Sequence, residues 1–320
     1  MTRQSSSLVL AAVIVAAGCG DGTGVRRLSI ATGGTGGVYY PYGGGIAQVL
    51  TAHLPGVEAT AEVTAASVDN LKFLRQGTSD LAFTMADIAQ DALAGRDVFE
   101  SFGPVPVRTL AVLYYNYMHL VTRTGSGIDG LDDLPGRLVS LGTPGGGGTV
   151  LAERILAAAG IDPATLRVRN LGVAQAADAL KDGKIDAFFW SGGVPTASVL
   201  DLVHTPGISI RLLPLDRLVE AMRERYGESL YARTVIPAGV YGLPADVPVI
   251  GVANMLVSTD RLSDDLAYGI TRVLFEQRDT LLRIHPQARE LAHATAVTGS
   301  TVPFHPGAVR YFREQGVWND

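Results

Sequence analysis

Apolar segments typical of β-strands alternate with amphipathic helical segments along almost the whole of this 320-residue chain. Such alternation is typical of parallel sheets that helices cover on both faces. The expected strands are 27–32, 57–64, 80–84, 109–115, 137–142, 166–170, 186–190, 208–213 and 249–258, and the expected late helices are 263–283 and a short one after Pro306. The sequence therefore predicts an α/β fold.

Two segments at the same stage of two successive strand–helix series resemble each other. LRQGTSDLAF (74–83) and LKDGKIDAFF (180–189) share leucine, glycine and aspartate at the same offsets. The length also favours two domains, because roughly 100–200 residues make one. We predict two similarly built lobes, joined by two strands where the chain crosses at 113–121 and returns at 246–258, and able to hinge. The predicted boundaries are 27–116 with 249–320 for lobe 1, and 117–248 for lobe 2.

The first residues have the features of a targeting segment, which we set apart from the fold. Leu8–Ala17 is an unbroken apolar run, too short to cross a bilayer core of roughly 30 Å. The small residues that follow it precede Cys19, the only cysteine, and this pattern resembles the lipobox of bacterial lipoproteins. We expect residues 1–18 to be a lipoprotein signal peptide, Cys19 to carry lipid and 19–26 to be a tether. The alternative is a secretory signal that is cut nearby.

Two glycine-rich junctions each follow an expected strand and open an expected helix. They are SIATGGTGGVYYPYGGGIAQVL (29–50) and LGTPGGGGTVLAERIL (141–156). Glycine lets a ligand approach the backbone, and a helix N-terminus offers unpaired N–H groups to an anion. The first junction has Tyr39 where the dinucleotide fingerprint needs its last glycine, and neither junction has the lysine of a phosphate-binding P-loop. Two such junctions across a cleft suit a small anionic ligand.

Composition and residue spacing argue against several other functions. The net charge is −5, and there are only three lysines and no basic block, so we expect no nucleic-acid partner. The six histidines form no metal-binding pair, no thiol remains besides Cys19, and no G-x-S-x-G motif is present. We therefore expect neither a metal nor a cofactor, and no enzymatic activity.

Five segments together carry a family resemblance. SIATGGTGGVYYPYGGGIA, ASVDNLKFLRQGTSDLAF, DLPGRLVSLGTPGGGG, DAFFWSGGVPT and PFHPGAVRYFREQGVW resemble the TAXI-type solute-binding subunits of tripartite ATP-independent periplasmic (TRAP) transporters, from about Leu28 to Trp318. This resemblance implies a two-lobed periplasmic-binding-protein fold of type II, with a mainly parallel sheet in each lobe. It also implies an extracytoplasmic protein that captures a small carboxylate, such as an amino acid or dicarboxylate, and delivers it to a TRAP permease. We expect a monomer held at the membrane by lipid.

The resemblance places Tyr39 at a ligand-contacting position and Ser67 and Asn70 at the start of the next ligand-facing helix. Position in the fold adds residues at the first crossing and at the end of a second-lobe strand, because sites lie off the carboxyl ends of such strands. The expected ligand-binding residues are Gly36, Gly37, Tyr39, Ser67, Asn70, Met85, Tyr114, Asn116, Gly146, Gly148, Thr149, Trp190 and Ser191.

The chain departs from the family pattern at two places. Gly145–Gly148 stands where the family usually has Gly-Ser-Gly-Thr, which leaves Thr149 as the nearby hydroxyl, and Met85 replaces a usual glutamine. The binding site therefore becomes more apolar, which argues against glutamate itself and allows a carboxylate with a larger apolar body. A second hypothesis is a ligand-sensing protein that passes lobe closure to a membrane signalling partner. An enzyme on the same bilobed fold is a third, disfavoured because no catalytic set is visible.

Overall fold

The computed structural model describes residues 24–318. The predicted signal peptide, Cys19 and most of the predicted tether lie outside the described residues. Within residues 24–318, no helix combines the length and apolar character needed to cross a membrane.

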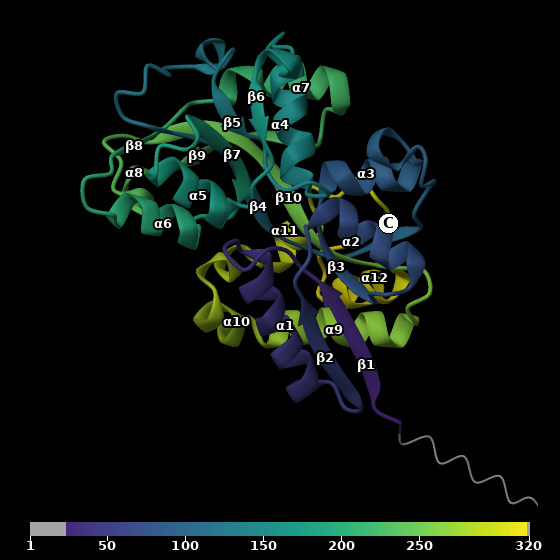
Figure 1. Ribbon diagram of the computed structural model, residues 1–320. Coiled ribbons are helices and arrows are strands. Elements are labelled where there is room, and N and C mark those ends of the chain that lie inside the picture. The colour runs from purple at the N-terminus through teal and green to yellow at the C-terminus, as the bar shows by residue number, and fades with distance from the viewer. Residues whose placement is uncertain (1–23, 319–320) are drawn as a thin grey trace, which may run out of the picture.

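Ten strands form one continuous sheet that passes through two lobes, with the order β2-β1-β3-β10-β4-β7-β5-β6, while β8 pairs with β4 and β9 with β10 (Figure 1). The strands are β1 (Arg26–Ala31), β2 (Val57–Glu62), β3 (Leu81–Met85), β4 (Val107–Arg123), β5 (Leu138–Ser140), β6 (Arg167–Arg169), β7 (Ala187–Gly192), β8 (Ile210–Leu212), β9 (Tyr231–Ile236) and β10 (Val247–Thr259). The helices are α1 (Tyr39–His53), α2 (Ser67–Gln76), α3 (Ala86–Ala94), α4 (Gly147–Ala158), α5 (Val173–Lys181), α6 (Ala197–His204), α7 (Val219–Tyr226), α8 (Ala238–Tyr241), α9 (Asp264–Glu276), α10 (Arg278–Ile284), α11 (His293–Ala296) and α12 (Pro306–Glu314).

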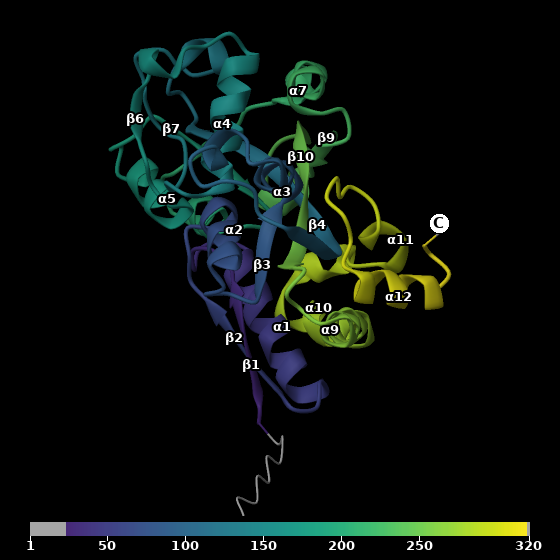
Figure 2. The same cartoon turned by 90° about the vertical axis from the view of Figure 1, so that its right-hand side faces the viewer.

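The long strands β4 and β10 connect the two lobes. They pair antiparallel with each other from Val107 opposite Thr259 to Tyr117 opposite Gly251. Beyond that point β4 continues into the second lobe, where it pairs with β7 and β8, while β10 begins beside β9. Figure 2 shows β10 passing between the lobes beside β4. The parallel pairs lie outside these two strands, where β1 joins β2 and β3, and β5 joins β6 and β7. This architecture is the two-lobed α/β fold that the sequence predicts.

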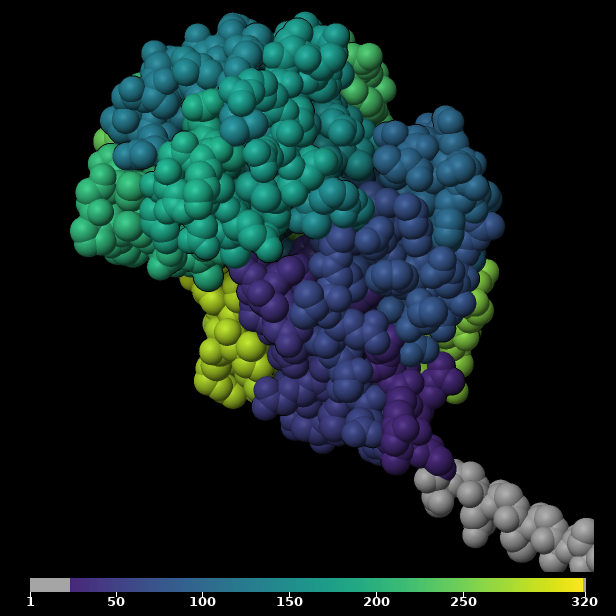
Figure 3. Space-filling model, viewed as in Figure 1, coloured from purple at the N-terminus to yellow at the C-terminus, as the bar shows by residue number. Residues whose placement is uncertain are grey.

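Three groups of buried apolar side chains fill the lobes. One lies under α1, α9 and α12 in the first lobe, and another lies under α5 and α6 in the second. The third runs without a break from α2 and α3 of the first lobe to α4 of the second. The lobes are therefore packed against each other, and Figure 3 shows the teal lobe seated on the blue and purple one.

Two elements differ from the sequence prediction. The single helix expected over 263–283 is two helices, α9 and α10, which meet at Gln277, and this change of direction lets Ile284 pack against Gly45 of α1. Strand β9 was not expected. Its side chains alternate between buried and exposed over only a short segment, and it forms through pairing with β10.

Candidate functional site

A cavity of about 80 Å³ lies between the two lobes, at the ends of several strands of the sheet. The first lobe contributes the segments before α1 and α2, together with Met85, Tyr114 and Asn116. The second lobe contributes the segments before α4 and α5 and the end of β7. The cavity thus lies where ligands bind in open α/β sheets, beyond the carboxyl ends of strands.

Five helices begin at this cavity. The residue that precedes the first turn lines the cavity in each case, and these N-cap residues are Val38, Ala66, Met85, Gly146 and Gly172 of α1 to α5. None of the five has a side chain that accepts a hydrogen bond from its own helix. The first N–H groups of a helix have no partner within the helix, and they form the positive end of its dipole. Asp69 lies in the first turn of α2, and Asp87 lies in the first turn of α3, where its carboxylate accepts from the Ile88 N–H. The positive helix ends without an acidic residue in the first turn are therefore those of α1, α4 and α5.

No charged side chain is among the described residues that line the cavity. The walls consist of glycine and alanine backbone, apolar side chains such as Met85, Phe189 and Trp190, and the neutral polar groups of serine, threonine, tyrosine and asparagine. An anion placed here would be held by backbone N–H groups and helix dipoles, because no arginine or lysine is available beside it.

The glycines of the second junction allow the lobes to approach closely. A Cβ atom on Gly146 would lie 2.9 Å from the carbonyl oxygens of Ala65 and Thr143. On Gly147 it would lie 2.7 Å from Met85 Cε and 2.9 Å from Ser67 Cβ, both in the first lobe. Gly148 differs from these two, because the nearest atoms to its Cβ would be 3.7 Å away. Close backbone approach therefore requires glycine at 146 and 147.

The first-lobe side of the cavity carries buried hydroxyl and amide groups. The Tyr39 hydroxyl donates to Asn254 Oδ1, while the Tyr114 hydroxyl and Asn116 Oδ1 are buried without a partner among the described residues. Burial raises the pKa of Tyr39 and of Tyr114, so both phenols stay neutral. These groups can hydrogen-bond to a ligand without adding charge.

Side-chain hydrogen bonds hold the second-lobe side of the cavity in place, and one of them crosses to the first lobe. The Trp190 indole Nε1 donates to Thr196 Oγ1 at 2.9 Å, and the Ser191 hydroxyl donates to Met85 Sδ of the other lobe at 3.3 Å. The Thr149 hydroxyl donates to the Thr143 carbonyl at 2.8 Å, so it closes the glycine loop.

His119 contacts the end of β7, where its Nδ1 lies 3.3 Å from the Trp190 carbonyl oxygen. Its Nδ1 lies 2.8 Å from the Tyr117 carbonyl oxygen, and its Nε2 lies 3.1 Å from the Tyr241 hydroxyl. This network fits the neutral tautomer that donates from Nδ1 and accepts at Nε2. Burial lowers the pKa of His119 to about 4, so the ring is neutral at physiological pH.

Eleven of the thirteen expected ligand-binding residues line the cavity. They are Gly37, Tyr39, Ser67, Met85, Tyr114, Asn116, Gly146, Gly148, Thr149, Trp190 and Ser191. Asn70 lies behind the wall, where its Nδ2 donates to the carbonyls of Thr32 at 2.7 Å and Phe83 at 2.8 Å and so ties β1 to β3. Gly36 lies at the edge between the lobes, where its carbonyl accepts from Ser198 Oγ at 3.2 Å.

Two parts of the wall were missed by the sequence analysis. The segment Leu171–Val173 opens α5 at the cavity, and the signal that could have revealed it is the single glycine after the expected strand 166–170. Ala66 takes φ of 83°, a conformation that favours glycine, and an alanine gives no sequence signal for it. Over the part of the chain that the structure describes, no group of three or more His, Cys, Asp or Glu side chains could hold a metal ion.

The two-lobed α/β arrangement is the fold of the type II periplasmic binding proteins. A structure from Bordetella bronchiseptica RB50 is 19% identical, with a TM-score of 0.53 over 90% of this chain and 88% of that one. A Xanthomonas citri protein solved with a chloride ion is 14% identical, with a TM-score of 0.51 over 91% and 97%. A candidate L-cystine ABC transporter from Listeria monocytogenes is also 14% identical, with a TM-score of 0.51 over 81% and 94%. These similarities establish the fold.

The family follows from the sequence itself. The model of the NMT1-like family matches residues 30–316, which include both lobes and every segment that lines the cavity. The chain belongs to the NMT1-like family.

Proposed function

We propose that this protein is an extracytoplasmic solute-binding protein that captures a small organic anion for uptake through a TRAP-type permease. The observation that carries the proposal is that α1, α4 and α5 begin at one interlobe cavity without an acidic residue in the first turn, and that no charged side chain of the described residues lines this cavity. Positive helix ends favour an anion, and the opposing lobes can enclose it. A substrate-binding role needs no catalytic group, which agrees with the neutral lining.

The lining also favours one type of anion. Glutamate and dicarboxylates present a second carboxylate, and within residues 24–318 no lysine or arginine lines the cavity to pair with it. Trp190, Phe189 and Met85 instead offer apolar surface beside the helix ends. We infer a monocarboxylate with an apolar body as the preferred ligand, with its carboxylate at the glycine loop before α4.

The TRAP assignment and the membrane attachment rest on sequence patterns. The five TAXI-like segments support a TRAP permease as the partner, and the residues before Cys19 support a lipid-anchored monomer on the outer side of the cell membrane. Membership of the NMT1-like family and the fold are compatible with this assignment.

A thermal-shift screen of the purified protein tests the anion class. A ligand that binds only the folded state adds RT ln(1 + [L]/Kd), which is about 2.7 kcal/mol at a hundredfold excess over Kd. We expect monocarboxylates to raise the melting temperature more than matched amides of the same carbon skeleton. A screen in which amines or neutral sugars shift the melting temperature and no carboxylate does would contradict the proposal.

The transport partner needs a separate experiment. Uptake of the bound solute by cells that carry this protein and its permease should stop when an ionophore collapses the ion gradient. Uptake that persists under the ionophore and stops on ATP depletion would contradict the TRAP assignment. A protein that binds solute without supporting any uptake would point instead to the ligand-sensing role.

A further inference from the structure

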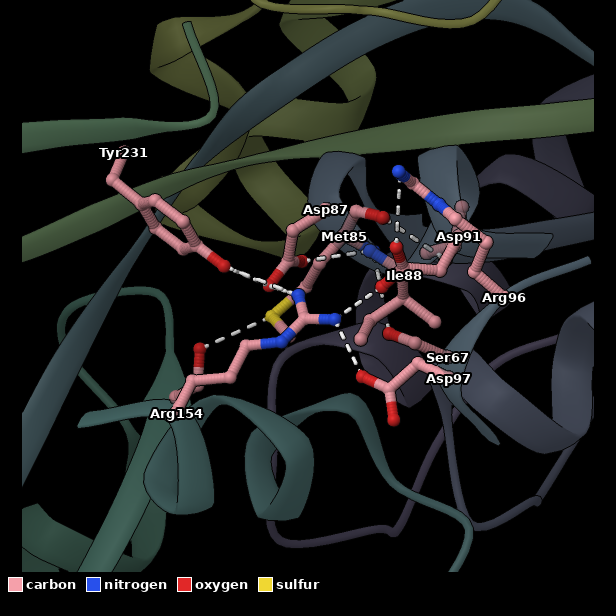
Figure 4. Close-up of polar contacts among 11 residues, drawn as sticks. Ser67, Met85, Asp87, Ile88, Asp91, Arg96, Asp97, Arg154 and Tyr231 are labelled. Atoms are coloured by element: carbon pink, nitrogen blue, oxygen red, sulfur yellow. Dashed lines mark hydrogen bonds and ion pairs between the residues drawn. The ribbon is translucent and has the colours of Figure 1, made fainter. Parts of the chain in front are cut away.

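A buried guanidinium connects the two lobes beside the cavity (Figure 4). Arg154 of α4, in the second lobe, reaches across to the first lobe and forms ion pairs with Asp87, Asp91 and Asp97. Its Nη1 lies 3.3 Å from Asp87 Oδ2, and its Nη2 lies 2.8 Å from Asp97 Oδ2. We call these four side chains the interlobe ion cluster.

Aromatic side chains of the second lobe complete the surroundings of Arg154. The Tyr231 hydroxyl accepts from Arg154 Nη1 at 3.2 Å and donates to Asp87 Oδ2 at 3.1 Å. The guanidinium carbon lies 4.8 Å from the centre of the Tyr226 ring. Planar guanidinium groups suit such combined pairing and stacking, and lysine does not reproduce this geometry.

The cluster is buried, so its charges are poorly screened. The side chain of Arg154 is 6% exposed, that of Asp87 is fully buried and that of Asp91 is 10% exposed. Burial alone would lower the pKa of Arg154, but the Asp87 carboxylate, with Tyr231 and Asp91, raises it above its ordinary value. Burial raises the pKa of Asp87, and Arg154 opposes that shift. Separation of the lobes would break the three ion pairs and the hydrogen bond from Tyr231 to Asp87 together, and the charged groups would then be hydrated in the open protein.

Both helices that carry the cluster also begin in the cavity. Helix α3 starts after Met85 and bears Asp87 and Asp91, while α4 starts after Gly146 and bears Arg154. The cluster therefore acts on the same two rigid elements whose N-termini face the ligand position. Asp97 follows α3 with φ of 54°, one of two positive φ values at described non-glycine residues, and the other is Ala66 at the cavity. Such strained residues persist where surrounding contacts hold them.

We propose that Arg154 is a positioning residue that latches the lobes in the closed arrangement, so that the protein favours closure even without solute. This inference rests on the proposed function only in that the lobes must part to admit a ligand. A latch of this kind makes spontaneous opening of the empty protein less frequent, and it slows ligand exchange. It also aligns the N-termini of α3 and α4 before a ligand arrives.

Trp190 reports on closure without any ligand. Its ring lies against the first lobe, because a Cβ atom on Gly37 would be 2.8 Å from Trp190 Cη2. The other tryptophan, Trp318, can be replaced by phenylalanine so that the emission comes from Trp190 alone. We would measure the emission maximum and acrylamide quenching of this Trp318→Phe background after unfolding and refolding have removed any co-purified solute.

Arg154→Met should shift Trp190 emission to longer wavelength and increase quenching, and Arg154→Lys should restore only part of the difference. The matched control is Arg96→Met, because Arg96 pairs with the same Asp91 at 3.4 Å but its side chain is 57% exposed. We expect the control to leave emission and quenching unchanged. Folded Arg154→Met protein with the unsubstituted Trp190 signal, or an equal shift in the control, would overturn the proposal.

Asp97→Asn keeps the experiment decisive where circular dichroism shows that Arg154→Met does not fold. Asparagine tolerates a positive φ, and the Asp97 side chain is 47% exposed, so this variant should fold. This variant should shift the Trp190 emission maximum in the same direction by a smaller amount. An unchanged emission spectrum would overturn the proposed latch. Since no solute is present, these results are independent of the anion screen.

Discussion

Two adjacent glycines of α4 give a matched test of how closely the lobes approach. Gly147 and Gly148 are the first two residues of the same helix, and neither has a positive φ. A Cβ atom on Gly147 would lie 2.9 Å from Ser67 Cβ across the cleft, whereas one on Gly148 would meet only Ser191 of its own lobe at 3.7 Å. Gly147→Ala should therefore oppose closure, and Gly148→Ala should not.

The size of the effect follows from the contacts at Gly147. Met85 Cε is the end of a flexible side chain and can shift, but Ser67 Cβ is fixed to the first residue of α2. Overpacking of this kind costs roughly 1–3 kcal/mol, which corresponds to about 5- to 150-fold in affinity. Because the contact arises only when the lobes close, the cost should appear in ligand binding and in Trp190 emission.

Calorimetric titration with the carboxylate found by the thermal-shift screen measures the two affinities. Gly147→Ala should weaken binding by the factor above, while Gly148→Ala, which also lines the cavity but makes no contact across the cleft, should weaken it less. Gly148→Ala should also gain up to about 1 kcal/mol in the free energy of unfolding, because alanine is the better helix former. Equal losses of affinity in the two variants would refute the argument, and so would full affinity in Gly147→Ala.

Three further predictions concern other parts of the chain. Cys19→Ala should move the protein from the membrane fraction to the soluble fraction, and unchanged sedimentation would contradict lipid attachment. The contribution of His119 to the free energy of unfolding should fall by roughly 3 kcal/mol as the pH drops from 6.5 to 4, because the unfolded chain protonates His119 while burial keeps its folded pKa near 4. In urea unfolding, the free energy of unfolding of His119→Asn should depend less steeply on pH over this range. An equally steep pH dependence would contradict the role of His119. Ala66→Gly should raise the free energy of unfolding by about 1 kcal/mol, because φ of 83° suits glycine, and a lower midpoint in urea would exclude that strain.

Local patterns predicted most of the fold. Apolar strand segments followed by glycine or proline determined most element positions, and the repeated Leu-Gly-Asp pattern indicated two lobes. The break between α9 and α10 was not predicted, because it depends on Ile284 packing against Gly45 in a distant helix. Strand β9 was likewise missed, since it depends on pairing with β10 rather than on a pattern of its own.

The site was predictable where the chemistry lies in the backbone. Both glycine junctions reach the cavity, because glycine after a strand is needed for close approach. Asn70 is a polar residue whose role depends on what its amide meets, and it meets carbonyls of β1 and β3. The interlobe ion cluster joins residues 57 to 67 positions apart, so no local motif reveals it.

The central claim is that the cavity selects an organic anion through uncapped helix ends. Mass spectrometry of the small molecules released when the purified protein is denatured tests it most directly, with Gly147→Ala protein prepared in parallel. We predict a carboxylate, with a single acidic group and an apolar body, that is enriched in the unsubstituted protein and reduced in the variant. A released amine or neutral sugar that is equally depleted in the variant would contradict the claim, because the same cavity would then be holding a ligand that its positive helix ends do not favour.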